Sequence, residues 1–399
     1  MARDAGGARA LIAPDTLAGI SAAVTAAASS GSALRLAGRG SWLDAGGPVE
    51  AGDVLSLSAY SGITDYVPGD LTITVRAGTP LAEIARATGE NDQWLPLDPP
   101  GSADGTIGAT VSTGSYGPLV TAFGRPRDQV LGIEFVSGTG EVITVGSRVV
   151  KNVAGFDLTR LMVGSWGTLG VITQLTLRLR ARSEVERSAA IVIPPGGQKL
   201  ASALCAVRAA RLAPLALELL SPAVAARLGL QRETLVLARL GGNEESVSAQ
   251  LAEIATLGAA VDAPDDCWDR LRALDADAAA TARFSMPLAD ISLAWDALAD
   301  SGQDEVLLRH ASVMRGIVRC LVREPRGQEA SSVDAISAIS AISAMSRTVG
   351  SARFIPERLG PGLWSRLAPS PVSDPISRRV KEAFDPGNVL NPGIFGAIQ

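Results

Sequence analysis

Residues 149–173 read VVKNVAGFDLTRLMVGSWGTLGVIT. This stretch gathers glycines and other small residues around a single tryptophan, Trp166, and then continues into an alternating segment typical of a β-strand. Glycine at this density is typical of a main chain that approaches another group closely, because no Cβ stands in the way. The stretch therefore predicts a place where the backbone closes over something.

The bulk composition fits a globular protein of more than one domain. The chain has 399 residues, 47% of them hydrophobic and 19% charged, with a net charge of −5. That charge argues against a nucleic-acid partner, which would need a clustered basic surface. No uninterrupted apolar run reaches the roughly 18 residues of a membrane span. The N-terminus is too weakly apolar for a signal peptide. We therefore expect no transmembrane segment and a cytoplasmic location.

Few side chains are available for metal or triad chemistry. The three cysteines, Cys205, Cys267 and Cys320, are far apart and form no CxxC pair, so we expect neither a zinc site nor an iron–sulfur cluster in this chain. His310 is the one histidine. A His-rich metal centre is thereby excluded, and a Ser-His-Asp triad would have to use His310, although no GxSxG motif supplies its serine.

The composition of the sequence changes near Arg182: glycine becomes less frequent, and helical patterns alternate with strand patterns. This predicts an α+β module with one antiparallel sheet and helices on a face. We expect one domain over 1–182, an inserted cap over 183–374, and a tail over 375–399 that returns to the first domain. The predicted helices cover 16–30, 80–88, 197–211, 245–257 and the AIS repeat at 335–346, and the predicted strands cover 33–36, 52–58, 71–77, 130–136, 141–145, 170–180, 189–194, 233–240, 283–288 and 312–322.

Four glycine-rich clusters need a common explanation; they lie at 38–41, 101–108, 114–117 and 164–170. The first does not match a dinucleotide fingerprint, because Leu43 stands where the third glycine belongs and the following DAGGP cannot start a helix. We interpret it as a backbone nest for an anion.

Together these clusters resemble the flavoproteins of the vanillyl-alcohol oxidase type, which carry a PCMH-type FAD-binding domain. Within them the chain is most similar to the FAD-binding subunits of bacterial glycolate oxidases. The resemblance covers nearly the whole chain, and its segments are GRGS (38–41), DLTITVRAGTPL (70–81), LPLDPP (95–100), TIGA (106–109), GRPRDQVLG (124–132), the stretch 149–173, WDRLR (268–272), RFSMP (283–287) and FDPGNVLNPG (384–393).

The resemblance implies an α+β fold: a PCMH-type two-subdomain FAD-binding domain with an inserted cap of antiparallel sheet plus helices. It implies FAD extended between the subdomains, with pyrophosphate against 38–41 and 106–114 and adenine near Val171 and Ile172. Glycines suit this, since backbone N–H groups reach phosphate where no Cβ intervenes. The implied cofactor-binding residues are Gly38, Arg39, Gly40, Ser41, Pro100, Gly101, Thr106, Ile107, Gly108, Ser112, Thr113, Gly114, Gly170, Val171, Ile172 and Asn391.

Three departures from the family bear on chemistry. Many relatives carry Glu where this chain has Trp166, which either stacks near the cofactor or, as we favour, belongs to the core. Residues 35–47 hold no histidine, so we expect non-covalent FAD. Ile394 follows Asn391-Pro392-Gly393, where relatives usually have Lys or Arg.

Oxidation of a 2-hydroxy acid requires a base for the hydroxyl proton and a cation for the carboxylate, beside the flavin. His310 is the candidate base, and Arg283 and Arg315 are candidate carboxylate ligands. Each of the three could instead have a structural role.

Two functions stay open: a flavoenzyme that oxidises glycolate or a similar 2-hydroxy acid, and a non-catalytic or electron-relaying FAD subunit. The single histidine and Ile394 favour the second, whereas the FAD motifs fit both. By resemblance, the partners would be a second flavoprotein subunit and an iron–sulfur subunit. Through such a partner the chain could also lie peripherally at the inner membrane.

Overall fold

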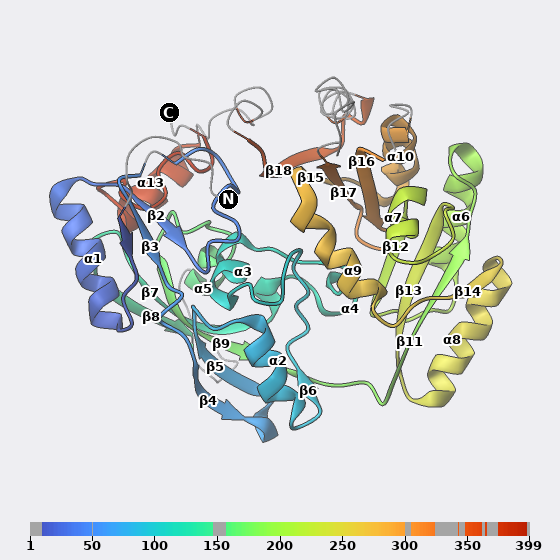
Figure 1. Ribbon diagram of the computed structural model, residues 1–399, viewed down its shortest axis with the longest axis horizontal. Coiled ribbons are helices and arrows are strands. Elements are labelled where there is room, and N and C mark those ends of the chain that lie inside the picture. The colour runs from blue at the N-terminus through green and yellow to red at the C-terminus, as the bar shows by residue number, and fades with distance from the viewer. Residues whose placement is uncertain are drawn as a thin grey trace.

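The computed structural model describes residues 10–49, 51–146, 157–299, 305–323, 342, 348–360, 364 and 374–396. Two lobes lie side by side in Figure 1, one built from the first 180 residues and the other from most of the remainder. The AIS repeat at 335–346, apart from Ile342, and the KNVAGF part of the glycine-rich stretch lie outside the described residues.

The first lobe contains a small parallel sheet and a larger antiparallel one. The parallel sheet has the order β1 (Leu11–Ile12), β3 (Asp53–Ser56), β2 (Leu34–Ala37). The antiparallel sheet has the order β4 (Ile63–Val67), β5 (Thr72–Arg76), β9 (Val171–Arg178), β7 (Val130–Val136), β8 (Val142–Gly146). The helices are α1 (Leu17–Ser30), α2 (Leu81–Gly89), α3 (Ile107–Thr113), α4 (Val120–Phe123) and α5 (Leu158–Met162), and a short pair of strands joins β6 (Gln93–Trp94) to β10 (Arg180–Ala181).

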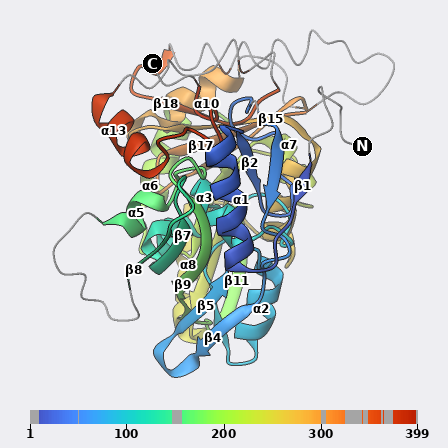
Figure 2. The ribbon, with the colours of Figure 1, turned by 90° about the vertical axis from the view of Figure 1, so that its left-hand side faces the viewer.

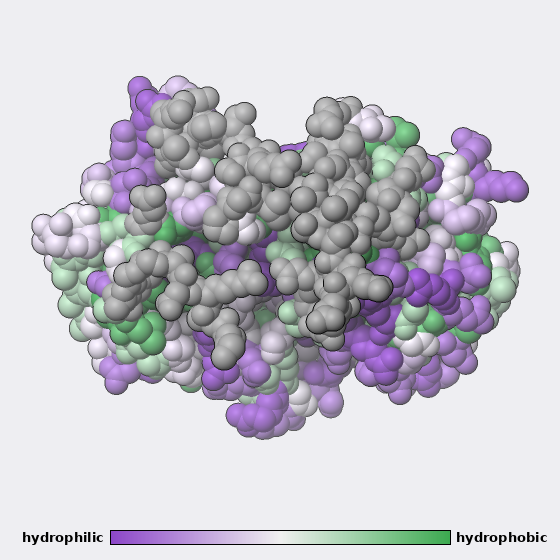
Figure 3. All heavy atoms as spheres, turned by 45° about the horizontal axis from the view of Figure 1, so that its top comes forward, coloured by the Kyte–Doolittle hydropathy of each residue, from purple (hydrophilic) through white to green (hydrophobic). Residues whose placement is uncertain are grey.

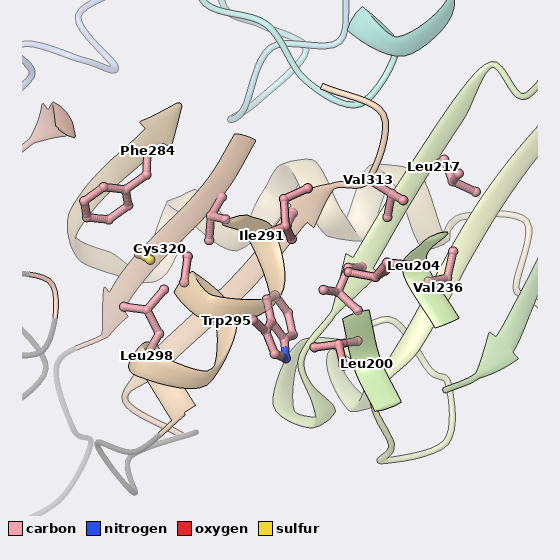
Figure 4. Close-up of a cluster of buried hydrophobic side chains, with 14 of the residues drawn as sticks. Leu200, Leu204, Leu217, Val236, Phe284, Ile291, Trp295, Leu298, Val313 and Cys320 are labelled. Atoms are coloured by element: carbon pink, nitrogen blue, oxygen red, sulfur yellow. The ribbon is translucent and has the colours of Figure 1, made fainter. Parts of the chain in front are cut away.

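The second lobe is built on one antiparallel sheet of eight strands. Its order is β14 (Ala260–Asp262), β11 (Val185–Val192), β13 (Leu235–Gly242), β12 (Ala216–Leu220), β16 (Leu307–Ser312), β17 (Ile317–Arg323), β15 (Ala278–Ser285), β18 (Arg353–Arg358). The side chains of α6 (Gly197–Ala209), α8 (Glu244–Leu257) and α10 (Ile291–Ala299) form one core with this sheet. In Figure 4, Trp295 of α10 points toward Leu200 and Leu204 of α6.

The opposite face of this sheet is covered by α7 (Pro222–Arg227) and α9 (Cys267–Ala273), which form a second core. The predicted α+β class with an antiparallel cap sheet is therefore confirmed, and helices cover both faces of that sheet instead of one.

The C-terminal tail packs on the first lobe. Helix α13 (Pro375–Phe384) places Val380 and Phe384 against the core that includes Ile20 of α1 and Val389 of the tail, and it lies beside the N-terminal sheets in Figure 2. Lys381 Nζ donates to the carbonyl oxygens of Thr168 at 2.8 Å and Leu390 at 3.3 Å. These contacts support the predicted division at 182 and 374, which stays a prediction.

Most predicted elements are observed within two or three residues of their expected ends, but the strands predicted over 189–194 and 283–288 begin four and five residues earlier, at Val185 (β11) and Ala278 (β15). The strand predicted over 312–322 is wrong: β16 ends at Ser312, a turn follows, and β17 begins at Ile317. The glycine-containing TIGA segment begins helix α3, capped by the Thr106 side chain, which accepts a hydrogen bond from Ala109 N. Glycine content alone suggested a loop there.

No helix in the described ranges is long and apolar enough to cross a bilayer. On the face seen in Figure 3, hydrophobic residues among the coloured atoms appear in small patches between hydrophilic ones.

Candidate active site

A cavity of about 310 Å³ opens among β2, α3, the start of β9 and the tail. Every cofactor residue predicted from the sequence lines it except Ile107 and Gly114. Ile107 is fully buried, and its N–H donates to the Thr79 carbonyl at 3.0 Å, while the Gly108 N–H donates to Ala77 at 2.9 Å. These two N–H groups are therefore engaged within the protein, and the pyrophosphate contact expected for 106–114 stays a prediction.

Residues 38–41 have the opposite character. Within the described part of the chain, none of their four N–H groups donates a hydrogen bond to the protein. Gly40 has a φ of 80°, the left-handed region that favours glycine. A Cβ on Gly38 would lie 2.2 Å from Oγ1 of Thr106, so only glycine allows this loop to contact α3. Consecutive unpaired N–H groups in such a turn form an anion-binding concavity, which fits a pyrophosphate.

Trp166 lies on the wall of this cavity. Its ring is half-buried, packs with Ile394 and lies 6.2 Å from the ring of Phe395 in an edge arrangement. Its backbone has a φ of 53°, and its N–H donates to the Ser112 carbonyl at 2.8 Å. Trp166 thus packs in a small apolar cluster and also lines the cavity, and its stacking near the cofactor stays a prediction. Ile394 also lines the cavity, so the position where relatives carry a cation is apolar here.

The side chain of Asn391, predicted to contact the cofactor, is engaged with the protein. Its Oδ1 accepts from Leu36 N at 2.8 Å and its Nδ2 donates to the Trp166 carbonyl at 2.7 Å. Asn391 therefore lines the cavity while joining the tail to β2 and to the glycine-rich stretch.

A second, smaller cavity of about 40 Å³ adjoins the first and shares Pro100 with it. His310 and Arg283, two of the three predicted catalytic residues, both line it. The register of the sheet explains this: His310 of β16 lies opposite Arg319 of β17, which lies opposite Arg283 of β15. Residues opposite one another on neighbouring strands point to the same face. This row faces Tyr116, Pro118 and Asp98 of the first lobe across the cavity.

His310 is paired with a buried carboxylate. Its Nδ1 lies 2.7 Å from Oε2 of Glu218 on β12, and the Glu218 residue is 2% exposed. With Nδ1–H donating to this carboxylate, the neutral ring keeps its Nε2 lone pair as a proton acceptor.

Arg319 and Arg283, two of the three arginines that line this cavity, differ in their contacts. Arg319 lies 2.9 Å from both Asp275 and Glu357, and these charges raise its pKa above the usual range although burial acts in the other direction. Burial alone would raise the pKa of Glu357, but Arg319 and Arg283 outweigh it and keep that pKa low. Arg283 lies only 3.6 Å from Glu357 and 4.4 Å above the ring of Tyr116, and among the described residues its Nε has no hydrogen-bond partner. Arg283 is therefore held by longer contacts than Arg319, although Nη2 of Arg319 also lacks a hydrogen bond of good geometry among the described residues.

Arg315 lies elsewhere. It occupies the turn between β16 and β17, lines neither cavity and donates to the Thr121 carbonyl at 2.8 Å. The structure thus brings His310 and Arg283 together and leaves Arg315 as a contact between the lobes.

Sequence reasoning missed Asp98, Glu218, Arg319 and Tyr116 in the smaller cavity. Asp98 lies within the quoted LPLDPP motif, and a single aspartate between prolines gives no chemical signal of its own. Burial raises the pKa of Asp98 to about 7, and Glu218 adds to that, whereas a hydrogen bond from Leu119 N and the charges of Arg272 and Arg239 act against it. Among the described residues, no group of three or more His, Cys, Asp or Glu side chains could hold a metal ion.

Comparison with known proteins now identifies the cofactor. Residues 8–146 match the family described as an FAD binding domain. Residues 8–146 therefore form an FAD-binding domain. Over 144 residues it is 42% identical to glycolate oxidase subunit GlcE of Escherichia coli (strain K12), which is 36% of this chain and 41% of that protein. The aligned part therefore spans less than half of that relative.

Two further comparisons cover most of the chain. An uncharacterised FAD-linked oxidoreductase of Mycobacterium tuberculosis (strain H37Rv) is 25% identical over 389 residues, covering 88% of this chain and 82% of that protein. The structure of 4-ethylphenol oxidase from Gulosibacter chungangensis superimposes with a TM-score of 0.73 at 15% identity, over 97% of this chain and 89% of that one. This likeness confirms the predicted PCMH-type fold.

Proposed function

We propose that this chain is an FAD-dependent oxidoreductase subunit that oxidises glycolate or a similarly small 2-hydroxy acid and passes the electrons to a partner subunit. The observation that carries the proposal is the convergence of the His310–Glu218 pair and Arg283 on one small cavity that adjoins the FAD cavity. The relation to a glycolate oxidase subunit supports the substrate class.

FAD, when bound, supplies the two-electron acceptor for the hydride of the substrate carbon. In the larger cavity, the free N–H groups of residues 38–41 would hold its pyrophosphate. FAD would be held without a covalent bond, because the described residues that line this cavity include no histidine, cysteine or tyrosine.

In the smaller cavity, Arg283 would bind the carboxylate of the acid, because a planar guanidinium matches two carboxylate oxygens. His310 Nε2 would take the hydroxyl proton, and the Glu218 carboxylate at Nδ1 would stabilise the imidazolium that forms. One water molecule takes up roughly 10–15 Å³ of a cavity volume of this kind. A cavity of about 40 Å³ therefore suits an acid of a few heavy atoms.

The second candidate is a non-catalytic or electron-relaying FAD subunit of a multi-subunit complex. Ile394 on the cavity wall favours it, because the cation that relatives place there is replaced by an apolar side chain. In either case we propose that a second flavoprotein subunit and an iron–sulfur subunit receive the electrons. The chain would then work in the cytoplasm or at the inner membrane through its partners.

Anaerobic mixing of the FAD-loaded chain with glycolate or D-lactate tests the proposal. We expect the flavin absorbance near the visible maximum to bleach with at least one acid, and a steady-state assay with an artificial acceptor to report turnover. A flavin that is reduced by dithionite and by neither acid would favour the electron-relaying role.

A further inference from the structure

Asp98 holds one carboxylate oxygen ready for a ligand. Its Oδ2 accepts a hydrogen bond from Leu119 N at 3.0 Å, which anchors the side chain to the start of α4. Among the described residues, Oδ1 accepts no hydrogen bond, although the residue is only 9% exposed and lines the smaller cavity. A Cβ on Gly117 would lie 2.8 Å from this oxygen, so glycine there leaves the carboxyl group room.

Burial is the main cause that disfavours the ionised form of Asp98, and the like charge of Glu218 on β12 adds to it. The charges of Arg272 on α9 and Arg239 on β13 act in the opposite direction without outweighing burial. His310, Arg283 and Arg319 line the same cavity. Because the cavity is only about 40 Å³, an acid held by Arg283 would also lie close to Asp98. An ionised Asp98 would repel that ligand, whereas a protonated one would offer it a donor.

We propose that Asp98 is a further ligand-binding residue of this cavity, whose protonated carboxyl group donates a hydrogen bond from Oδ1 to the carboxylate of the bound acid. This inference rests on the proposed function. Arg283 then supplies the charge that attracts the ligand, and Asp98 fixes the orientation of its carboxylate from the other lobe.

Anion binding is coupled to protonation in this arrangement. Burial already places the pKa of Asp98 at about 7, so the acid form is available near neutral pH. Above that pH the ligand must bring a proton with it to the site. Its dissociation constant should then rise about tenfold for each pH unit, because one proton is taken up for each ligand bound.

Oxamate is a suitable probe, because it is a small monoanionic acid that lacks the hydroxyl-bearing carbon and cannot be oxidised in this reaction. Calorimetric titration of the FAD-loaded full chain from pH 6 to pH 9 should give a nearly constant dissociation constant below pH 7 and a tenfold increase per unit above it. Repeating the titration at pH 8 in buffers of different ionisation enthalpy should show uptake of close to one proton.

Asp98→Asn keeps an oxygen for Leu119 N and a permanent donor at the other position. We expect it to bind oxamate with a dissociation constant that stays level over this range. Asp104→Asn is the matched control, because the Asp104 side chain is 75% exposed and lines neither cavity, and it should reproduce the wild-type curve.

Three outcomes would overturn the inference: no oxamate binding at pH 6, a level wild-type curve, or an unchanged pH dependence in Asp98→Asn, which would assign the effect to His310. If Asp98→Asn does not fold, a level wild-type curve or the absence of proton uptake at pH 8 still overturns the inference. The readout is separate from turnover. A chain that oxidises glycolate but binds oxamate independently of pH refutes only the role of Asp98, and a chain that binds oxamate as expected without reducing FAD refutes only the proposed function.

Discussion

The side-chain amide of Asn391 donates a 2.7 Å hydrogen bond to the carbonyl of Trp166, which lies 225 residues earlier in the chain. The same amide accepts from Leu36 N at 2.8 Å. Three distant segments therefore meet at one side chain: β2, the glycine-rich stretch and the C-terminal tail. Because Trp166 has a left-handed backbone that is rare for a bulky residue, these bonds keep it in a conformation that it would not adopt alone.

Replacement of Asn391 should therefore loosen the wall of the larger cavity, where we propose that FAD binds. In Asn391→Ala the Leu36 N–H and the Trp166 carbonyl lose their partners, which should cost about 1–3 kcal/mol in the free energy of unfolding. The flavin-to-protein ratio of the purified variant should fall with it. Asn391→Asp keeps the acceptor for the Leu36 N–H but not the donor for the Trp166 carbonyl. Its stability and its flavin-to-protein ratio should therefore lie between those of the wild type and Asn391→Ala. A fully loaded and equally stable Asn391→Ala would show that the tail merely covers the cavity.

Local patterns were sufficient for much of the fold. Thr16 precedes an alanine-rich run and does cap α1, because a cap and a periodic stretch are properties of adjacent residues. The turn between β16 and β17 was missed because HASVMRG carries a single glycine and no proline, asparagine or aspartate that would mark a turn. The candidate site was predictable only in part. His310 and Arg283 share a cavity because of the register of β16, β17 and β15, and register depends on contacts across the whole sheet.

FAD should be released by acid. Within the described lining of the larger cavity, no histidine, cysteine or tyrosine can form a bond to the flavin ring. Precipitation of the holoprotein with trichloroacetic acid should leave all yellow colour in the supernatant, as measured by its absorbance. Colour retained in the pellet would mean that a residue outside this lining is attached to the flavin.

Gly108 should prove essential for packing and not for direct contact with phosphate. From the sequence, a side chain at this position would be expected to displace the cofactor, but a Cβ built on Gly108 lies 2.6 Å from the Cβ of Ala77 and 2.8 Å from its carbonyl oxygen. In Gly108→Ala, the new Cβ should push α3 away from Ala77, which directly follows β5. We expect the free energy of unfolding to fall by roughly 1–3 kcal/mol, with loss of FAD as a consequence.

The matched control is Gly89→Ala at the end of α2, where a Cβ would meet nothing within 4 Å. Alanine there should be neutral or stabilise the protein by about 0.5–1 kcal/mol. Urea unfolding of the apoproteins separates the two effects, because it reports on packing without the cofactor. If apo Gly108→Ala were as stable as the wild type but failed to bind FAD, direct contact with the cofactor would be the better explanation.

Arg283 and Arg315 can be distinguished by the same substitution. Arg283→Met removes a guanidinium of the smaller cavity whose Nε has no hydrogen-bond partner among the described residues. The KM for glycolate or D-lactate should rise at least tenfold, since a charge-assisted bond contributes about 1.5–3 kcal/mol. Arg315→Met removes a contact to the Thr121 carbonyl on the surface and should leave KM near the wild-type value. Equal losses in the two variants would indicate that the acid does not bind against Arg283.

Asp98 should make the stability of the protein depend on pH even without ligand. Its pKa is about 7 in the folded chain and near 3.8 in an unfolded one, so the folded state holds the proton more tightly. Its contribution to stability is therefore complete below about pH 4 and disappears as the pH rises toward 7, at up to about 1.4 kcal/mol per pH unit. The side chain at position 98 cannot titrate in Asp98→Asn, so the stability of this variant should not fall in this way as the pH rises. Relative to the variant, the wild type should thus become less stable between pH 5 and pH 7, by about 2 kcal/mol, in urea unfolding curves of the apoprotein. Asp104→Asn should follow the wild type, and an Asp98→Asn curve parallel to the wild type would mean that the carboxyl group is ionised in the folded protein at pH 5.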